Sequence, residues 1–423
     1  MTWGSAFQIL GGVGLFLFGI KLMSEALQYL AGDRMRQLIG SLTKTPIRGV
    51  FVGALVAMLI QSSSGTTVMT VSFVHAGLMS LKQAVGVIMG ANIGTTVIAQ
   101  IVAFKIKDFS LPILGFGVML VLFGRTKRLR YMGNGLVGFG LLFLGMQTME
   151  GSMVFLRDRK DLFLAFSSNP FLGLFVGTAV TMLVQASSAT IGLTMAMASQ
   201  GLLSLDAAIP ILLGDNIGTT ITAVLASMGS NRSAKQAATA HVLFNVIGAC
   251  IFLAALPLFK QAVVATSGDI SRQIANAHTI FNVTNTLMFL PFVSVFVWFI
   301  RKIVPDRGEH VVTGPMYLDM KLINASPAAA VDAVKKEMVH MGMLARSMLR
   351  DVQTAFEENS SKMINEVTQT EKGVNEINRA ITSYASEIWQ NGLSSDLSTV
   401  LGAYVNSVEE IERIGDHATN LIE

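Results

Sequence analysis

Long apolar stretches separated by short polar segments run through the first three-quarters of the chain. They occupy residues 5–30, 49–60, 66–78, 83–104, 110–124, 132–156, 171–184, 190–201, 207–228, 238–259 and 279–300. Several reach the roughly 20 residues that a helix needs to cross a bilayer. Four are too short to span it comfortably, and polar residues join them in two pairs, 49–60 with 66–78 and 171–184 with 190–201. Paired short arms are typical of re-entrant hairpins and broken helices, so the pattern predicts an all-α, polytopic membrane protein.

A gap-free internal repeat contains both pairs of short arms. Residues 46–96 align with residues 170–220 at a constant offset of 124, with 24 identities in 51 positions. Identity this dense indicates a duplicated unit. If each short pair enters and leaves the membrane on one side, three full crossings precede the second unit, and an odd number inverts it. The sequence therefore predicts two inverted-topology repeats, an architecture found in secondary transporters.

Basic residues between the apolar stretches predict how the chain is oriented. One set of loops holds thirteen of them: Arg34, Arg36, Lys44, Arg48, Arg125, Lys127, Arg128, Arg130, Arg232, Lys235, Arg301, Lys302 and Arg307. The opposite set holds seven: Lys105, Lys107, Arg157, Arg159, Lys160, Lys260 and Arg272. Because cytoplasmic loops carry the excess of Lys and Arg, we expect the N-terminus outside and the C-terminal domain in the cytoplasm. The expected location is the inner (plasma) membrane, crossed several times.

Charge and composition divide the chain into two domains. Residues 1–319 hold 22 Lys/Arg and 12 Asp/Glu, whereas residues 320–423 hold 9 and 15. Only 14% of all residues are charged, against about 25% in soluble proteins. We expect a membrane transport domain (1–304), a linker (305–326) and a helical domain (327–423). Within the first, repeat one spans about 5–124, repeat two about 132–259, and an extra helix about 278–303.

Hydroxyl and amide side chains join the two arms of each pair. They are Gln61, Ser62, Ser63, Ser64 and Thr66 in the first pair, and Gln185, Ser187, Ser188 and Thr190 in the second. Placing these groups against lipid alone would be costly. Hydroxyls donate to an anion or offer oxygen to a hard cation, and a helix that restarts here points free N–H groups into the break. We expect a site for an oxyanion with small cations, the alternative being hydrogen bonds that only join helices.

A second repeated segment follows each pair of arms. It reads Asn-Ile-Gly-Thr-Thr and supplies Asn92, Thr95 and Thr96 in the first unit, and Asn216, Thr219 and Thr220 in the second. Its glycine and hydroxyls favour a locally unwound helix whose oxygens face a cavity. The alternative is a close helix contact made through the glycine.

Asp215 stands where the first unit has Ala91. A lone carboxylate in an apolar span is a functional candidate, and we expect it to coordinate a cation, the alternative being a hydrogen-bonded structural acid. No Lys or Arg lies within these motifs. A bound anion would therefore be neutralised by cations that bind with it.

A His-x-x-x-Asn pattern occurs twice, at His241 with Asn245 and at His278 with Asn282. Residues at i and i+4 share a helix face. No carboxylate or Cys completes a metal ligand set, so hydrogen bonds between helices are expected for the histidines. Asn282 is also a candidate for the ligand site.

Other functional classes find no support in the sequence. The serine segments have no nucleophile elbow, and the chain has no Walker motif, so we do not expect an enzyme or a cofactor. The single Cys250 excludes a disulfide-stapled domain. Basic residues lie in short loops, a pattern that orients membrane proteins, and nucleic acid is therefore not an expected partner.

The two Gln-x-Ser-Ser segments, each followed by Gly-x-Asn-Ile-Gly-Thr-Thr, resemble the type II sodium/phosphate cotransporter family over about residues 5–303. The resemblance implies sodium-driven phosphate uptake by alternating access. It implies a phosphate and sodium site at Gln61, Ser62, Ser63, Ser64, Thr66, Gln185, Ser187, Ser188 and Thr190. Ala186 and Ala189 depart from the family pattern and imply a smaller contribution from the second unit.

The C-terminal domain has apolar positions at helical spacing over 328–358, 362–391 and 397–422, which predicts a small helical bundle. It resembles a PhoU-type domain, and the acidic segment near its end implies metal binding by Glu412 and Asp416. The alternative is a solvated acidic face.

The expected function is a symporter that carries phosphate with sodium as the coupling ion. A passive anion channel or phosphate exporter, and a membrane phosphate sensor acting through the tail, are the alternatives. The expected partners are phosphate, sodium and the lipid bilayer. A homodimer and a regulatory partner for the C-terminal domain are left open.

Overall fold

The computed structural model describes residues 3–31, 45–104, 109–154, 156, 168–305, 314–358 and 360–422. Within these ranges the chain is helical and contains no strand, which confirms the all-α prediction. It divides into two compact units. One comprises residues 1–68, 82–228 and 237–300, and the other comprises residues 69–81, 229–236 and 301–423.

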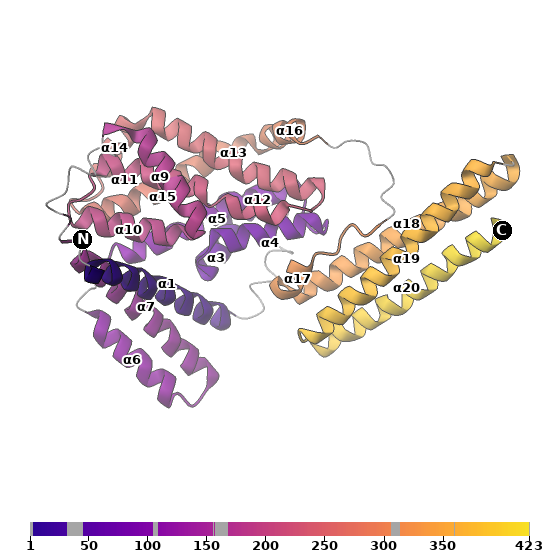
Figure 1. Ribbon diagram of the computed structural model, residues 1–423, viewed down its shortest axis with the longest axis horizontal. Helices are drawn as coiled ribbons and strands as arrows, with labels where there is room; N and C mark the ends of the chain where they lie inside the picture. The colour runs from indigo at the N-terminus through magenta and orange to yellow at the C-terminus, as the bar shows by residue number, and fades with distance from the viewer. Residues whose placement is uncertain are drawn as a thin grey trace. The chain divides into compact units, whose positions relative to one another are not determined.

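The first compact unit contains most of the apolar helices (Figure 1). They are α1 (Trp3–Ala31), α3 (Pro46–Ile60), the start of α4 (Ser63–His75), α5 (Leu81–Val102), α6 (Ser110–Phe123), α7 (Lys127–Ser152), α9 (Pro170–Val184), α10 (Ser187–Ser199), α11 (Leu205–Gly218), α12 (Ile221–Ser227), α13 (Arg232–Ala254), α14 (Leu256–Val264), α15 (Ile270–Phe289), η3 (Leu290–Phe292) and α16 (Val293–Ile303). Helices α4, α5, α13 and α16 each extend into the second compact unit at one end.

Five helical segments among the described residues are long and apolar enough to cross a membrane. They are Gly4–Leu30, Leu81–Val102, Leu205–Ser227, Arg232–Ala254 and Ile270–Ile303. Such spans, with the shorter apolar helices between them, make this a multi-pass membrane protein.

The four short arms form separate helices with matching ends. Helix α3 begins at Pro46 after the side-chain cap of Thr45, and α9 begins at Pro170 after the cap of Asn169. Proline suits the first helical turn because its missing N–H has no partner to lose there. Both helices stop at a glutamine in the left-handed conformation, Gln61 at φ 55° and Gln185 at φ 56°.

Glycines pack the first arm of each pair directly against the helix that follows the second arm. A Cβ at Gly53 of α3 would collide with the Val87 carbonyl of α5, and one at Gly177 of α9 would collide with the Ile211 carbonyl of α11. Gly90 of α5 has the same relation to α3. The two units of the repeat are therefore packed alike, backbone against backbone, through positions that correspond in the repeat.

Helices α1 and α7 also meet through glycine, and they run antiparallel. Gly12 lies against Gly145, and Gly19 lies against Gly138, so positions later in one helix meet positions earlier in the other. Figure 1 shows α1 and α7 side by side, with α6 next to α7.

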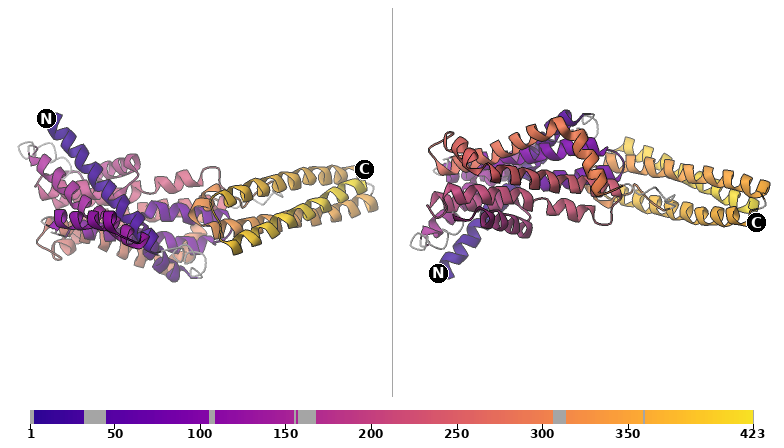
Figure 2. Two further views of the ribbon diagram at one scale, coloured as in Figure 1. Left: turned by 90° about the horizontal axis from the view of Figure 1, so that it is seen from below. Right: turned by 90° about the horizontal axis from the view of Figure 1, so that it is seen from above.

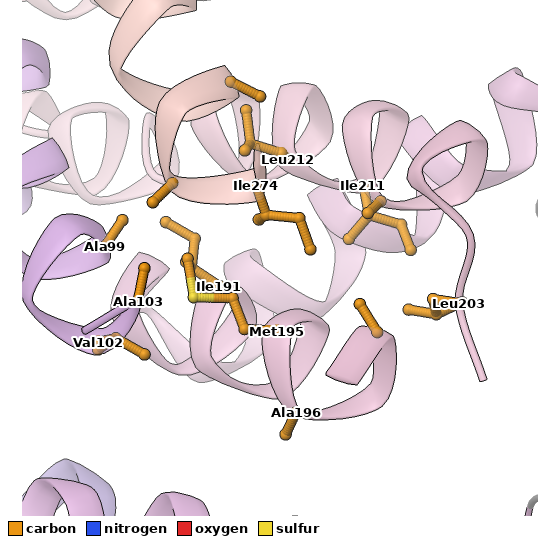
Figure 3. Close-up of a cluster of buried hydrophobic side chains, with 14 of the residues drawn as sticks. Ala99, Val102, Ala103, Ile191, Met195, Ala196, Leu203, Ile211, Leu212 and Ile274 are labelled. Carbon is orange, nitrogen blue, oxygen red and sulfur yellow. The ribbon is translucent and has the colours of Figure 1, made fainter. Parts of the chain in front are cut away.

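A hydrophobic core forms where the second unit of the repeat meets α5 and α15. Figure 3 shows Ala99 and Val102 of α5 facing Ile191 and Met195 of α10, with Ile274 of α15 beside them. All of these side chains are buried. This core fixes α10, and with it the serine segment at the start of that helix.

The second compact unit contains the short α17 (Met320–Ala325) and three long helices, α18 (Pro327–Glu358), α19 (Ser361–Gln390) and α20 (Ser395–Ile422). The long helices pack against one another along their length (Figure 2). Buried residues such as Met341, Leu344 and Met348 recur at helical spacing along α18. The C-terminal domain is therefore a helical bundle, as the spacing predicts.

The unwinding predicted at the Asn-Ile-Gly-Thr-Thr segments is found in the second unit of the repeat but not in the first. The prediction is wrong in the first unit, where α5 continues without a break through Asn92 to Val102. In the second unit of the repeat, α11 ends at Gly218 and α12 begins at Ile221. In both segments the threonine hydroxyls donate to carbonyls of the preceding turn, and such bonds do not require the helix to open.

Candidate functional site

The first tip consists of the residues between α3 and α4 with the first turn of α4. The Ser62 hydroxyl accepts a hydrogen bond from the Gly65 amide at 3.0 Å and so caps α4. Ser63 is buried and begins the helix, while Gln61, Ser62 and Ser64 are half-buried. The Gln61 amide donates to the Met58 carbonyl at 2.5 Å, and its Oε1 atom is buried without a partner.

The Thr66 side chain bonds within this tip. Its hydroxyl donates to the Ser62 carbonyl at 2.9 Å, and the side chain is fully buried. The structure thus gathers the predicted residues of the first tip at the start of one helix, where first-turn N–H groups point outward.

The second tip lies between α9 and α10 and lacks the hydroxyl cap. Ala186 stands at the N-cap of α10 and makes no side-chain hydrogen bond to it. Ser187 and Ser188 are half-buried in the first turn, and Gln185 is exposed. The Ala189 amide, which stands where Gly65 stands in the first tip, donates instead to the Ala186 carbonyl at 3.1 Å.

Asp215 is joined to the second tip by a short chain of hydroxyls. The Thr181 hydroxyl donates to Asp215 Oδ1 at 2.7 Å and lies 2.7 Å from the Thr190 hydroxyl. Asp215 is completely buried, and its Oδ2 atom has no hydrogen-bond partner. The sequence interpretation missed Thr181. The signal that could have revealed it is a difference between the two units of the repeat, since the first unit has Ala57 at this position.

The hydroxyls of the Asn-Ile-Gly-Thr-Thr segments bond to their own helices. Thr95 donates to the Asn92 carbonyl, Thr96 to Ile93, Thr219 to Asn216 and Thr220 to Ile217, at 2.7–3.0 Å. Such bonds occupy the hydroxyl hydrogen but leave oxygen lone pairs available. All four threonines are buried.

The asparagines of the two segments have different partners. Asn92 Nδ2 donates to Asn245 Oδ1 of α13 at 2.8 Å, which is a buried contact between helices. Asn216 Nδ2 donates to the Leu212 carbonyl of its own helix at 2.9 Å. The two units are therefore not equivalent at this position.

The His-x-x-x-Asn pairs bond through the backbone of the histidine. Asn245 donates to the His241 carbonyl and Asn282 to the His278 carbonyl, each at 3.0 Å. Both ring nitrogens of His241 are buried without a partner, so the expected interhelical bond is not formed there. Asn282 Oδ1 is likewise buried and unpartnered.

Helix α1 contacts one arm of each duplicated unit, α3 in the first and α10 in the second, which the sequence did not indicate. The Ser24 hydroxyl donates to the Ile60 carbonyl at 2.5 Å, directly before the first tip. The Phe16 ring covers Gly192 of α10, in the helix that begins at the second tip. One helix thus supports both serine segments.

The acidic segment of the tail is a cluster on α19 and α20. Burial, and then the neighbouring carboxylates Asp416, Glu371 and Glu409, raise the pKa of Glu412. Among the described residues no group of three or more His, Cys, Asp or Glu side chains is arranged to hold a metal ion. The predicted metal site at Glu412 and Asp416 therefore remains a prediction.

Family models match both parts of the chain. The model described as Na+/Pi-cotransporter matches residues 15–151 and again residues 152–270. The PhoU domain model matches residues 338–423.

Several known proteins are similar to this chain. The uncharacterized protein YqeW of Bacillus subtilis is 30% identical over 293 residues, covering 69% of this chain and 95% of that protein. YjbB of Escherichia coli, named for inorganic phosphate export, is 23% identical over 414 residues, covering 97% of this chain and 76% of that protein. The human sodium-dependent phosphate transport protein 2B is 41% identical over 102 residues, 24% of this chain and 15% of that protein. No solved structure matches significantly.

Proposed function

The chain belongs to the Na+/Pi-cotransporter family, and we propose that it is a symporter that moves inorganic phosphate across the membrane together with sodium. The family supports phosphate transport, and the relatives with named functions are transporters rather than enzymes. Sodium coupling, alternating access and the residues of the site are the proposed part.

The observation that carries the proposal is the pair of serine tips. Each follows a glutamine in the left-handed conformation and begins a new helix at a serine, Ser63 in one and Ser187 in the other. In this proposal the hydroxyls and first-turn amides of both tips bind the phosphate oxygens. Sodium binds to hydroxyl, carbonyl and carboxylate oxygens beside it and offsets the charge of the anion.

Alternating access rests on the repeat and on α1. The antiparallel contact of α1 with α7 is what inverted repeats require, since each of these helices precedes one duplicated unit. In the proposed cycle the two units change position relative to α1, and the site opens first to one side of the membrane and then to the other.

Uptake of labelled phosphate into proteoliposomes tests the proposal. With wild-type protein, uptake is expected with sodium outside and not with potassium. Ser63→Ala and Ser188→Ala should each raise the phosphate KM about tenfold or more, because each loses a hydrogen bond to a charged ligand. Ser72→Ala on α4 and Ser199→Ala on α10 are matched controls, since each removes a hydroxyl farther along the same helix. Unchanged kinetics in both tip variants would contradict the site.

Phosphate export is the second candidate function. It is favoured by the similarity to YjbB, which extends over 97% of this chain and includes the tail. Phosphate efflux from preloaded vesicles that persists without a sodium gradient would support export or a passive channel over symport. A sensor role predicts instead that deleting residues 320–423 removes signalling and leaves transport intact.

A further inference from the structure

The duplicated units differ at two positions that meet in the second unit. Thr181 and Asp215 lie in hydrogen-bond contact at 2.7 Å. Their counterparts in the first unit, at the constant offset of the repeat, are Ala57 and Ala91. The first unit therefore has neither the carboxylate nor the hydroxyl that binds it.

Asp215 lacks a compensating charge in the protein. The residue is completely buried, Oδ1 accepts its hydrogen bond from a neutral hydroxyl, and Oδ2 has no partner. In the part of the chain that the structure describes, no basic side chain forms an ion pair with it. A buried carboxylate in this situation is stable only when a cation or a proton neutralises it.

The oxygen atoms around Asp215 suit a small, hard cation of single charge. Besides Oδ2, the Thr181 and Thr190 hydroxyls lie 2.7 Å apart next to it and retain lone pairs. Oxygen ligands without Cys or His disfavour transition metals. A single carboxylate balances one positive charge, whereas calcium sites in proteins usually gather several carboxylates.

We infer that Asp215, Thr181 and Thr190 bind one sodium ion, and that this ion binds in the second unit only. The inference rests on the proposed function for the identity of the coupling ion. It assigns different ligands to the two units, because Ala57 and Ala91 leave the first unit without an equivalent site. The two duplicated units therefore bind sodium differently beside the same anion.

Sodium titration of phosphate uptake in proteoliposomes tests the inference in the full-length chain. Asp215→Asn keeps the size of the side chain and removes its charge. We expect it to raise the half-saturating sodium concentration about tenfold or more, since a charge-assisted ligand is lost. The Hill coefficient for sodium should fall by about one when the remaining ions still couple to transport.

A matched pair of threonine variants separates the ion site from general packing. Thr181→Val removes the hydroxyl that binds Asp215 and should raise the half-saturating sodium concentration severalfold. Thr178 lies one turn earlier on α9, and its hydroxyl donates to the Leu174 and Gly214 carbonyls. Thr178→Val should leave the sodium titration unchanged. Thr181→Ser keeps a hydroxyl, so its half-saturating sodium concentration should match that of the wild type.

Binding of ²²Na⁺ to the purified protein in detergent separates this inference from the proposed function. If the wild-type chain transports phosphate without sodium, the symport proposal fails, but loss of one bound sodium ion in Asp215→Asn would still support the site. Equal sodium binding in wild type and Asp215→Asn would overturn it. So would an unchanged sodium titration with a lost pH dependence of uptake, because Asp215 would then carry a proton.

Discussion

Two glutamines adopt a backbone conformation that side chains normally avoid. Gln61 and Gln185 have φ values of 55° and 56° at equivalent positions of the repeat. A residue other than glycine pays about 1–2 kcal/mol for the left-handed region, so both units of the repeat carry the same local cost at this position. The two amides differ, since that of Gln61 is half-buried with an unpartnered oxygen and that of Gln185 is exposed.

Substitutions at these glutamines should separate backbone strain from ligand binding. Gln61→Gly and Gln185→Gly are expected to keep or raise the melting temperature, because glycine adopts positive φ freely. Gln61→Val and Gln185→Val should lower it, since a β-branched residue is a genuine outlier there. Phosphate uptake should fall in Gln61→Gly despite intact stability. Equal melting temperatures for the glycine and valine variants would contradict the assigned strain.

Individual residues also show what a sequence can and cannot predict. The serine tips and Asp215 stand out because polar groups in apolar stretches are costly. Thr181 and Ser24 do not, because a lone hydroxyl in an apolar helix most often bonds to its own backbone. Their partners, Asp215 and Ile60, lie more than thirty residues away in the chain.

At the scale of helices, glycine lets α3 meet α5, and α9 meet α11, backbone to backbone. Gly53 and Gly177 occupy equivalent places in α3 and α9, each against a backbone carbonyl of the neighbouring helix, α5 or α11. Small residues permit this close approach between helices in membranes. The helices themselves were predictable from apolar length, and the internal repeat predicted that the two pairs would pack alike. The unbroken α5 was not predictable, because the second unit has the same five residues and its helix is interrupted there, between α11 and α12.

Adding a methyl group at either glycine should disrupt the pair. Gly53→Ala and Gly177→Ala are expected to destabilise the protein by about 1–3 kcal/mol or more, because the methyl group would overlap a backbone atom that cannot rotate away. Gly115→Ala on α6, where nothing lies within 4 Å of an added Cβ, is the control and should be neutral. Thermal unfolding in detergent measures the difference. A Gly53→Ala variant as stable as Gly115→Ala would show that α3 and α5 are not packed backbone to backbone.

At the scale of the whole molecule, the distribution of basic residues predicts an orientation that the helices alone do not determine. The expected arrangement places the start of α7, which contains Arg128, and the tail in the cytoplasm, and the segment around Gly268 outside. The family assignment and the apolar helices establish a multi-pass membrane protein. The side of the membrane on which each loop lies remains a prediction.

The single native cysteine makes this orientation directly measurable. In a Cys250→Ala background, Gly268→Cys should react with a membrane-impermeant maleimide added to intact cells. Arg128→Cys and Ser394→Cys, both at exposed positions, should react only after the membrane is permeabilised. Labelling of Ser394→Cys in intact cells would place the tail outside and reverse the predicted topology.

The glycine contacts have a mechanical consequence for any transport cycle. Where two helices touch through their main chains, no layer of side chains lies between them to slide or repack, so α3 travels with α5, and α9 travels with α11. Displacing a serine tip must then carry the neighbouring Asn-Ile-Gly-Thr-Thr segment with it. Substrate release would follow from the separation of two such rigid bodies, rather than from the bending of a single arm.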